Sequence, residues 1–273
     1  MQKVDLHSHT NCSDGVLTPD QLLAEAAAAG IELFSITDHD TVEAYRSIKA
    51  DIPSSLTLVP GIELSCTWRH LTIHIVGLGI DLESVLINQV EERQGKARND
   101  RFLTILQKLE KRNLKIDREK IIAQAGNTPG RPHIARYLVE TGQVKSAQQA
   151  FDKYLGQGKV GDIKECWPGL EQIVSWIVQM GGVAVMAHPV KYKLTRTKLM
   201  ELCTEFKEAG GVAIEVISGQ QTPQQMTMIT AIARQLDLFA SVGSDFHSPE
   251  QTWIKLGRIP ELPPQLKPVW TQL

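Results

Sequence analysis

The feature that most constrains the fold is a regular alternation of strand-like and helix-like segments at both ends of the chain. Short apolar runs of strand length occupy residues 4–6, 31–37, 56–59, 62–64, 72–80, 183–186, 212–217 and 238–243. Helix-forming stretches lie among them at 18–30, 41–50, 171–180, 195–209 and 223–235. Alternation of this kind predicts a parallel α/β sheet or barrel.

The middle of the chain has a different character, because residues 85–160 are polar, helix-forming and poor in strand-like runs. Helices are expected there at 85–114, 117–124, 132–140 and 147–155. A helical segment between two alternating segments predicts one α/β domain that carries an insertion. The expected parts are residues 1–84 for the first part of the α/β domain, 85–168 for the helical insertion and 169–273 for the second part.

Composition narrows the class of protein only a little. The formal net charge is −2, and 42% of the 273 residues are hydrophobic. These values are typical of a globular protein and argue against a disordered chain or a uniformly basic nucleic-acid binder. Four isolated cysteines, no apolar signal segment and no run long enough to cross a bilayer favour a cytoplasmic protein.

Histidine and carboxylate residues follow, or lie within, the strand-like runs. They are His7, His9, Asp14, His39, Glu63, His74, His188, Asp245 and His247. The carboxyl ends of parallel strands gather on one face, which usually carries the active site, so we expect these side chains to converge. Imidazoles and carboxylates without a cysteine ligand suit Zn, Mn or Fe, and several shared carboxylates favour a cluster of ions.

Each of these short motifs has a simpler reading when it is taken alone. A single His-x-His pair is more often an ordinary surface or core pair than a metal site, and a His before Pro, as at His188, is often a loop residue. The joint pattern is different, because scattered histidines would not fall repeatedly at strand ends. His70 is the exception, and we interpret it as a solvated loop histidine.

A glycine pattern at Gly156, Gly158 and Gly161 matches the dinucleotide-binding fingerprint. That fingerprint requires a strand before the glycines, and here a helix-like stretch precedes them. We therefore interpret the pattern as a turn.

Taken together, the motifs resemble those of the PHP (polymerase and histidinol phosphatase) metal-dependent phosphoesterases. The matching segments are Asp5-Leu6-His7-Ser8-His9-Thr10, Ser13-Asp14-Gly15, Ile36-Thr37-Asp38-His39-Asp40, Pro60-Gly61-Ile62-Glu63, His74-Ile75-Val76-Gly77, Ala187-His188-Pro189 and Gly243-Ser244-Asp245-Phe246-His247. The middle segments resemble the subgroup of bacterial nucleoside 3′,5′-bisphosphate phosphatases that also trim short RNA from the 5′ end, the RNase AM type. They are Arg98-Asn99-x-Arg101 and Gly130-Arg131-Pro132-His133-Ile134-Ala135-Arg136.

The resemblance implies a distorted (β/α)7 barrel with a helical insertion and three divalent metal ions. Manganese is the usual ion in the family, and iron or zinc also occurs. His7, His9, Glu63 and Asp245 would hold the first ion. Glu63 would bridge to a second ion, which His74 and His188 would also hold. The third ion would be held by Asp14, His39 and His247.

The implied activity is hydrolysis of the 3′-phosphate of nucleoside 3′,5′-bisphosphates, together with 5′→3′ exonuclease activity on short RNA. Our hypothesis is in-line attack by a metal-bridging hydroxide, because no Ser or Cys nucleophile with a base partner is apparent. His133 is the candidate proton donor or phosphate contact. Arg98, Asn99, Arg101 and Arg131 join His133 as candidate substrate-binding residues, since arginine matches phosphate oxygens in pairs.

Two alternatives stay open at this point. One is a phosphatase of the histidinol-phosphate type, against which the arginine-bearing insertion argues. The other is a non-catalytic metal-binding PHP module that stabilises a partner protein, which the complete ligand set disfavours. We expect a nucleotide or short RNA as the partner, and neither a membrane nor an obligate protein partner.

Overall fold

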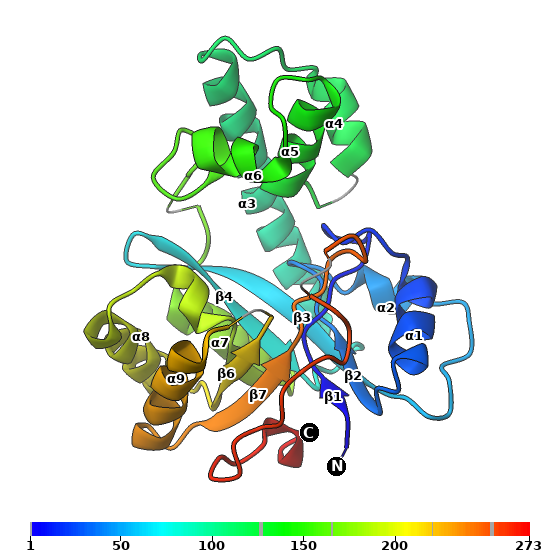
Figure 1. Ribbon diagram of the computed structural model, residues 1–273, viewed down its shortest axis with the longest axis vertical. Coiled ribbons are helices and arrows are strands. Elements are labelled where there is room, and N and C mark those ends of the chain that lie inside the picture. The colour runs from blue at the N-terminus through cyan, green and yellow to red at the C-terminus, as the bar shows by residue number, and fades with distance from the viewer. Residues whose placement is uncertain (1, 126–127, 165, 220, 252–253) are drawn as a thin grey trace.

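The computed structural model of the protein describes residues 2–125, 128–164, 166–219, 221–251 and 254–273. A seven-stranded sheet forms a nearly closed barrel, and a group of helices lies above one end of it (Figure 1). Neighbouring strands follow the order of the sequence. They are β1 (Val4–Asp5), β2 (Leu33–Ile36), β3 (Thr57–Trp68), β4 (Leu71–Leu78), β5 (Val183–Met186), β6 (Ala213–Ser218) and β7 (Phe239–Gly243).

The two edges of the sheet approach each other beside the N-terminal strand. The Leu6 amide donates to the Val242 carbonyl at 3.0 Å, and Ser8 forms a parallel bridge with Phe246. These contacts bring β7 back to the segment that follows β1. The prediction of a distorted (β/α)7 barrel is therefore confirmed.

One strand departs from the expected parallel arrangement. β4 runs antiparallel to both β3 and β5, whereas the other neighbouring pairs in the sheet are parallel. The runs at 56–59 and 62–64 also merge into the single long strand β3, which returns directly into β4 with no helix between them. Hydrophobic periodicity does not encode strand direction, and a two-residue turn at Arg69 and His70 permits only a hairpin.

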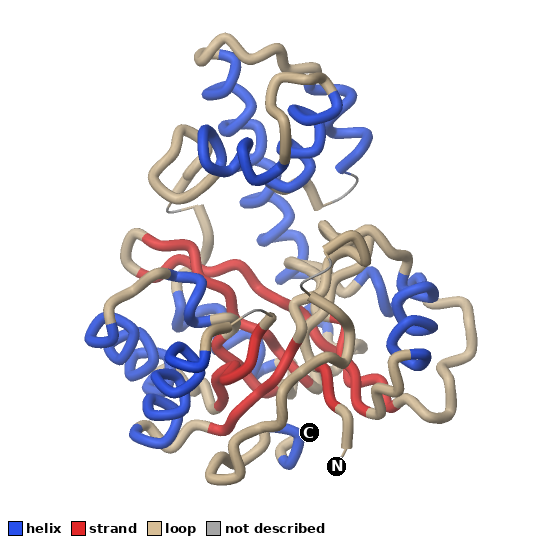
Figure 2. Tube along the Cα trace, viewed as in Figure 1, coloured by secondary structure: helices blue, strands red, loops and turns tan. Residues whose placement is uncertain are grey.

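Helices cover the outside of the barrel (Figures 1 and 2). They are α1 (Pro19–Ala28), α2 (Glu43–Ser47), α7 (Leu170–Gln179), α8 (Arg196–Glu208) and α9 (Pro223–Gln235). Thr18 begins α1 with a capping box, in which its side chain accepts from the Gln21 amide and Gln21 bonds back to the Thr18 amide. Thr222 and Gln225 begin α9 in the same way. Short 3-10 turns are η2 (Pro189–Tyr192) and η3 (Val269–Thr271).

The insertion consists of helices and loops (Figure 2). Its elements are α3 (Val85–Glu110), α4 (Arg118–Ala125), α5 (Arg131–Glu140), α6 (Ala147–Ala150) and the π-helical turn η1 (Phe151–Leu155). The first part of α3 packs Ile87 and Val90 into the barrel core, while Phe102 and Leu106 belong to a separate apolar cluster within the insertion. α3 is therefore one continuous helix that contributes to both hydrophobic cores.

No helix in the described ranges is both long enough and apolar enough to cross a membrane.

Candidate metal centre

The nine histidine and carboxylate residues identified in the sequence gather at one place in the barrel. Three overlapping groups have ligand atoms within 4.8 Å of one another. These groups are His9, Asp14, His39 and His247; His7, His9 and Glu63; and His39, Glu63 and His74. His188 and Asp245 lie beside them through contacts to Glu63, His7 and His9. Residues that are up to 240 positions apart in sequence thus share one site.

Four atoms surround a single point at the base of this site. His7 Nε2 and His9 Nε2 are 3.1 Å apart, and each lies 3.4 Å from Glu63 Oε2. Asp245 Oδ1 lies 3.5 Å from His7 Nε2 and 3.3 Å from His9 Nε2. An ion bound roughly 2.1 Å from each ligand sets neighbouring ligand atoms roughly 3.0–3.4 Å apart. The spacing of these four atoms therefore fits one divalent cation.

The second carboxylate oxygen of Glu63 faces a different pair of imidazoles. Glu63 Oε1 lies 3.0 Å from His74 Nδ1 and 2.9 Å from His188 Nε2. Glu63 comes from the middle of β3 and His74 from the middle of the antiparallel β4, whereas His188 follows β5. One carboxylate thus has an oxygen in each of two ligand groups, as a bridging ligand requires.

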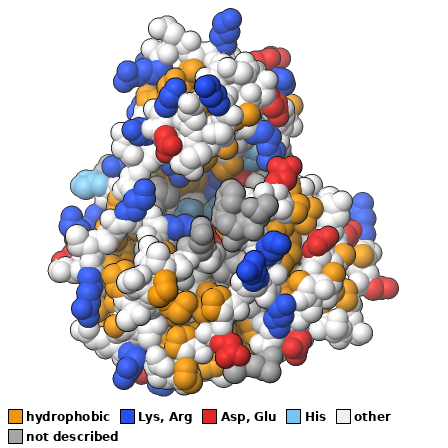
Figure 3. Space-filling model, in the orientation of Figure 1, with side chains coloured by type: hydrophobic (Ala, Val, Ile, Leu, Met, Phe, Trp, Pro, Cys, Tyr) orange, Lys and Arg blue, Asp and Glu red, His pale blue; other side chains and the backbone are white. Residues whose placement is uncertain are grey.

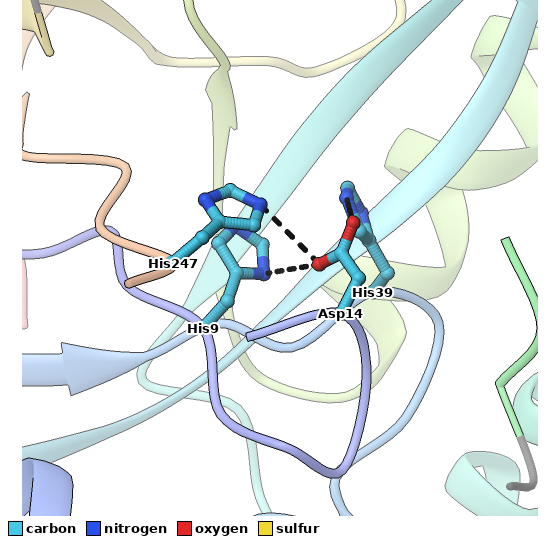
Figure 4. A group of neighbouring side chains, drawn as sticks. All are labelled: His9, Asp14, His39 and His247. Atoms are coloured by element: carbon cyan, nitrogen blue, oxygen red, sulfur yellow. Dashed lines mark ion pairs between the residues drawn. The ribbon is translucent and has the colours of Figure 1, made fainter. Parts of the chain in front are cut away.

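Asp14 is the centre of the third group (Figure 4). Its Oδ1 lies 3.2 Å from His247 Nε2, and its Oδ2 lies 3.7 Å from His39 Nε2. The other ring nitrogen of His39, Nδ1, lies 2.9 Å from Glu63 Oε2. The His39 ring therefore connects the Asp14 group to Glu63, which the sequence did not predict.

Several buried polar atoms of the site lack a hydrogen-bond partner among the described residues, which favours a bound cation. His9 Nδ1, Asp14 Oδ1, His39 Nδ1, Glu63 Oε2 and His188 Nδ1 are buried and make no hydrogen bond with the residues that the structure describes. Buried polar atoms are rarely left in this state unless another group, such as an ion, interacts with them. Since the donors are nitrogen and oxygen atoms alone, the set fits a divalent metal such as Mn, Fe or Zn.

Local electrostatics favour neutral imidazoles at His9, His74 and His188 and an ionised carboxylate at Glu63. Burial lowers the pKa of His9, His188 and His74, in the last case to about 4. Burial alone would raise the pKa of Glu63, but electrostatic interaction with the surrounding histidines, His39 and His74 first, holds it well below its usual range. Neutral imidazole and ionised carboxylate are the forms that bind metals.

His7 differs because a second carboxylate orients its ring. Glu215 Oε1 lies 2.5 Å from His7 Nδ1, and Glu215 Oε2 accepts from the His188 amide at 2.6 Å. Burial opposes protonation of His7, but the charges of Glu215 and Glu63 outweigh it and raise the pKa of His7 to about 10. A carboxylate bonded to Nδ1 directs Nε2 toward the metal position. Sequence reasoning missed Glu215, although a charged residue inside the apolar run 212–217 was a usable signal.

Two further aspartates that follow β2 hold the surrounding loops. Asp38 accepts from the Thr10 amide at 2.7 Å and from the hydroxyl groups of Thr10 and Ser13. Asp40 accepts from the Ser65 amide at 2.7 Å and from its hydroxyl at 2.9 Å. Their carboxylates therefore hold neighbouring segments instead of joining the ligand groups.

The backbone is strained at three places beside the site. Asp40, His188 and Asp245 have φ values of 57°, 26° and 55°, in the left-handed region that non-glycine residues rarely adopt. Such conformations cost about 1–3 kcal/mol each and persist where the surroundings impose them. At Gly243, a Cβ atom would lie 2.3 Å from His7 Cβ, so the end of β7 can approach His7 only as glycine.

The insertion brings its arginines near this face, but with different partners. Arg98 is buried and donates through Nε to Asp40 at 2.9 Å, and through Nη2 to Asp40 and to the Ser65 hydroxyl. Arg101 is also buried, donates to the Ile163 carbonyl at 3.3 Å and stacks near Trp167. Asn99 is exposed on α3 and is not among the residues that line the cavities described below.

α5 supplies the other two candidates. Arg131 donates to the Leu155 carbonyl at 3.0 Å and lines the cavity above the metal centre. His133 is buried, and its Nδ1 accepts from the Gly130 amide at 3.1 Å. Because Nδ1 is an acceptor there, a neutral His133 carries its proton on Nε2. Burial lowers the pKa of His133.

A cavity of about 360 Å³ lies between the barrel and the insertion. His39, His74, His188, Asp245 and His247 line its barrel side, and Arg131, Phe151, Gly156 and Lys164 are among the residues on its insertion side. Figure 3 shows a hollow at this level that contains histidine and lysine or arginine side chains. Gly156, from the glycine pattern, caps the end of η1 and thus follows a helix, as the turn interpretation requires.

Residues 5–161 match the PHP domain family. The chain is 42% identical over 271 residues to the 5′-3′ exoribonuclease Rnm of Escherichia coli strain K12, covering 97% of this chain and 92% of that protein. It is 36% identical to the 3′,5′-nucleoside bisphosphate phosphatase of Chromobacterium violaceum, covering 100% of this chain and 97% of that protein. The chain therefore belongs to the PHP domain family.

Solved structures agree with this assignment. A Chromobacterium violaceum amidohydrolase, solved with bound sulfate and without metal, has a TM-score of 0.91, 36% identity and coverage of 99% and 95% of the two chains. A Bifidobacterium adolescentis protein assigned as a metal-dependent phosphoesterase has a TM-score of 0.78, 26% identity and coverage of 99% and 94%. The predictions of a PHP-type fold and of a phosphoric ester hydrolase are confirmed.

Proposed function

We propose that this protein hydrolyses the 3′-phosphate of nucleoside 3′,5′-bisphosphates and also removes nucleotides from the 5′ end of short RNA. The observation that carries the proposal is the convergence of nine candidate ligand side chains, five of which line a cavity that Arg131 enters from the insertion. The relatives named for these two activities match over nearly the whole chain, which supports the same substrates here.

Three divalent ions, with manganese as the preferred ion, would occupy the centre. His7, His9, Glu63 and Asp245 would hold the first ion, with Glu63 bridging to a second. His74 and His188 would complete the second position, and Asp14, His39 and His247 would hold the third. Such ions supply an activated water molecule and offset the charge of the phosphoryl oxygens.

The residues of the insertion would position the substrate. Arg131 faces the cavity with a guanidinium group that can hold the phosphate that is not hydrolysed. Arg98, fixed by Asp40, would fasten α3 to the loop that carries His39 and would contact substrate only through its remaining amino group. Arg101 would support this wall through Trp167, and Asn99 has no contact in this proposal.

His133 would donate a proton to the leaving oxygen. Nε2 is the ring nitrogen that would face the leaving oxygen, because the Gly130 amide occupies Nδ1. The transfer would start from the imidazolium form and leave the ring neutral, and the lowered pKa makes release of a proton from that form easier than from an ordinary imidazolium. Residues 85–168 would then act as a substrate cap over the barrel parts 1–84 and 169–273. All four cysteines are free, which supports a cytoplasmic location.

A phosphate-release panel tests the proposal. The purified chain, with its metal content measured, is supplied with adenosine 3′,5′-bisphosphate, histidinol phosphate and a short 5′-phosphorylated RNA. We expect hydrolysis of the bisphosphate and shortening of the RNA, both abolished by a chelator. Preferred hydrolysis of histidinol phosphate would replace the proposal with that phosphatase type. Bound metal without any hydrolysis would instead indicate a non-catalytic module.

A further inference from the structure

Two cavities open from the metal centre, in different directions. The 360 Å³ cavity runs past the β3–β4 hairpin at His70 and Thr72, and a second cavity of about 850 Å³ runs past α5 and Ser248. They share Phe151, Lys191, Asp245 and His247, so both begin at the catalytic face. A substrate longer than one nucleotide could extend into either cavity.

The charges that line the two cavities differ. Among the described residues, beyond the shared ones and the proposed metal ligands, three cationic side chains and one carboxylate line the smaller cavity: Arg131, Lys164, Lys193 and Asp162. The larger cavity is lined by one cation and two carboxylates, Arg136, Glu140 and Glu250. A phosphodiester backbone is attracted to the first lining and repelled by the second.

The cations of the smaller cavity come from both of its walls. Lys193 follows η2 on the barrel, and Lys164 lies in the segment that returns from the insertion. Both are exposed, whereas Lys191 of η2 pairs with Asp245 at the metal centre. The ion pair of Lys164 with a described residue is a long one, 3.7 Å to Asp162, and the side chain is exposed, so its ammonium group can reach other anions. A strand between these walls would meet cations on both sides.

We propose that the RNA downstream of the 5′ nucleotide lies in the smaller cavity, with its backbone phosphates between Lys164 and Lys193. This inference rests on the proposed function and adds a path for the polymer. The contacts involve phosphates alone, so they would not select a base sequence. A nucleoside bisphosphate would be too short to reach these two lysines, so they would contact RNA but not the bisphosphate.

The double substitution Lys164→Glu/Lys193→Glu tests this path. Its rates are compared with those of the unmodified enzyme on adenosine 3′,5′-bisphosphate and on a 5′-phosphorylated tetraadenylate. We expect kcat/KM on the RNA to fall about 10- to 30-fold, mainly through KM, and the bisphosphate rate to stay within about twofold. The dependence of log KM on log salt concentration should also flatten, by about 0.7 for each lost phosphate contact.

Two controls carry the same kind of charge change. Lys153→Glu/Lys198→Glu reverses one exposed charge on each part, outside both cavities, and should leave RNA cleavage unchanged. Arg136→Glu alters the larger cavity, and it too should leave the RNA rate unchanged. A selective loss of RNA cleavage in Arg136→Glu would place the strand in the other cavity and overturn the inference.

The remaining outcomes separate this inference from the proposed function. Equal losses on both substrates, or no loss on RNA, would overturn the lysine path while bisphosphate hydrolysis still stands. Hydrolysis of the bisphosphate by the unmodified enzyme without any action on RNA would overturn it as well. Failure of the unmodified enzyme on both substrates would refute the proposed function itself.

Discussion

The side of the barrel that carries the proposed metal ligands, here called the barrel face, lines the same cavity as the insertion. The polar contacts that hold the two regions in place differ. On the barrel face, each ligand carboxylate contacts several histidines, and a further carboxylate, Glu215, fixes His7. The insertion is anchored through a smaller polar junction, in which Gln94 and Arg98 of α3 bind Asp40 and Thr128 bonds to the Cys12 carbonyl. We propose from this difference that the barrel holds the metal ions and that the insertion mainly positions the substrate.

The largest expected effect comes from the centre of the barrel face. Glu63→Gln removes the charge that contacts His7, His9, His39, His74 and His188 at once. We expect at least a roughly 10³-fold loss of hydrolysis together with loss of bound metal. Metal analysis and phosphate release measure the two quantities. The exposed control Glu201→Gln should change neither the metal content nor the rate. Full activity of Glu63→Gln would contradict the proposal that Glu63 bridges two metal ions.

A substitution at the polar junction between the barrel and the insertion should lower the stability of the protein. Arg98→Ala leaves the buried Asp40 carboxylate without its cation, which costs about 3–5 kcal/mol. Urea unfolding measures the change in the free energy of unfolding. Arg93→Ala, an exposed change on the same helix, should cost less than about 0.5 kcal/mol. An Arg98→Ala protein of normal stability with impaired bisphosphate hydrolysis would instead make Arg98 mainly a substrate contact.

His133 tests whether the insertion also contributes to the chemical step. His133→Ala should lower kcat about 10²-fold while metal content stays unchanged, because a proton donor is lost. His133→Asn keeps a side-chain acceptor for the Gly130 amide, and should show the same loss of kcat with a less disturbed α5. Loss of metal in either variant would move His133 into the ligand set.

Glu215 tests the outer support of the barrel face. Glu215→Gln should weaken metal binding about 10- to 100-fold, because His7 loses the carboxylate that orients its ring. Titration of the stripped protein with Mn²⁺ measures the affinity, and Glu208→Gln is the exposed control. Unchanged affinity in Glu215→Gln would show that the backbone alone holds His7.

The smallest effect is expected at the roof of the cavity. Arg131→Ala should lower kcat/KM about tenfold for adenosine 3′,5′-bisphosphate, and by less for a nucleoside 3′-monophosphate, because only the former has the additional phosphate. Arg136→Ala, on the same helix but facing the other cavity, is the matched control. Equal losses on both substrates would contradict the assignment of Arg131 to the second phosphate.

The convergence of the nine proposed ligands could be predicted because local sequence places them, at strand ends for His7, His9 and His188 or inside an apolar strand run for Glu63 and His74. The antiparallel direction of β4 could not be predicted, since hydrophobic periodicity is the same in parallel and antiparallel strands. The roles of the insertion residues were also harder to predict, because they depend on pairing between distant segments.

Arg98 was expected to face the substrate, but its partner Asp40 lies 58 residues away, and no local pattern reveals such a pairing. Glu215 stands out locally as a charge in an apolar run, but its pairing with His7, 208 residues away, could not be read from the sequence. Roles that depend on long-range pairing thus needed the fold, whereas roles set by neighbouring residues did not.

The most direct test of the central claim joins metal content to hydrolysis in one titration. The purified chain is stripped with a chelator, and Mn²⁺ is added back while phosphate release from adenosine 3′,5′-bisphosphate is followed. We predict no release from the stripped chain and recovery that saturates as the proposed metal positions fill. Undiminished release from the stripped chain would contradict this prediction.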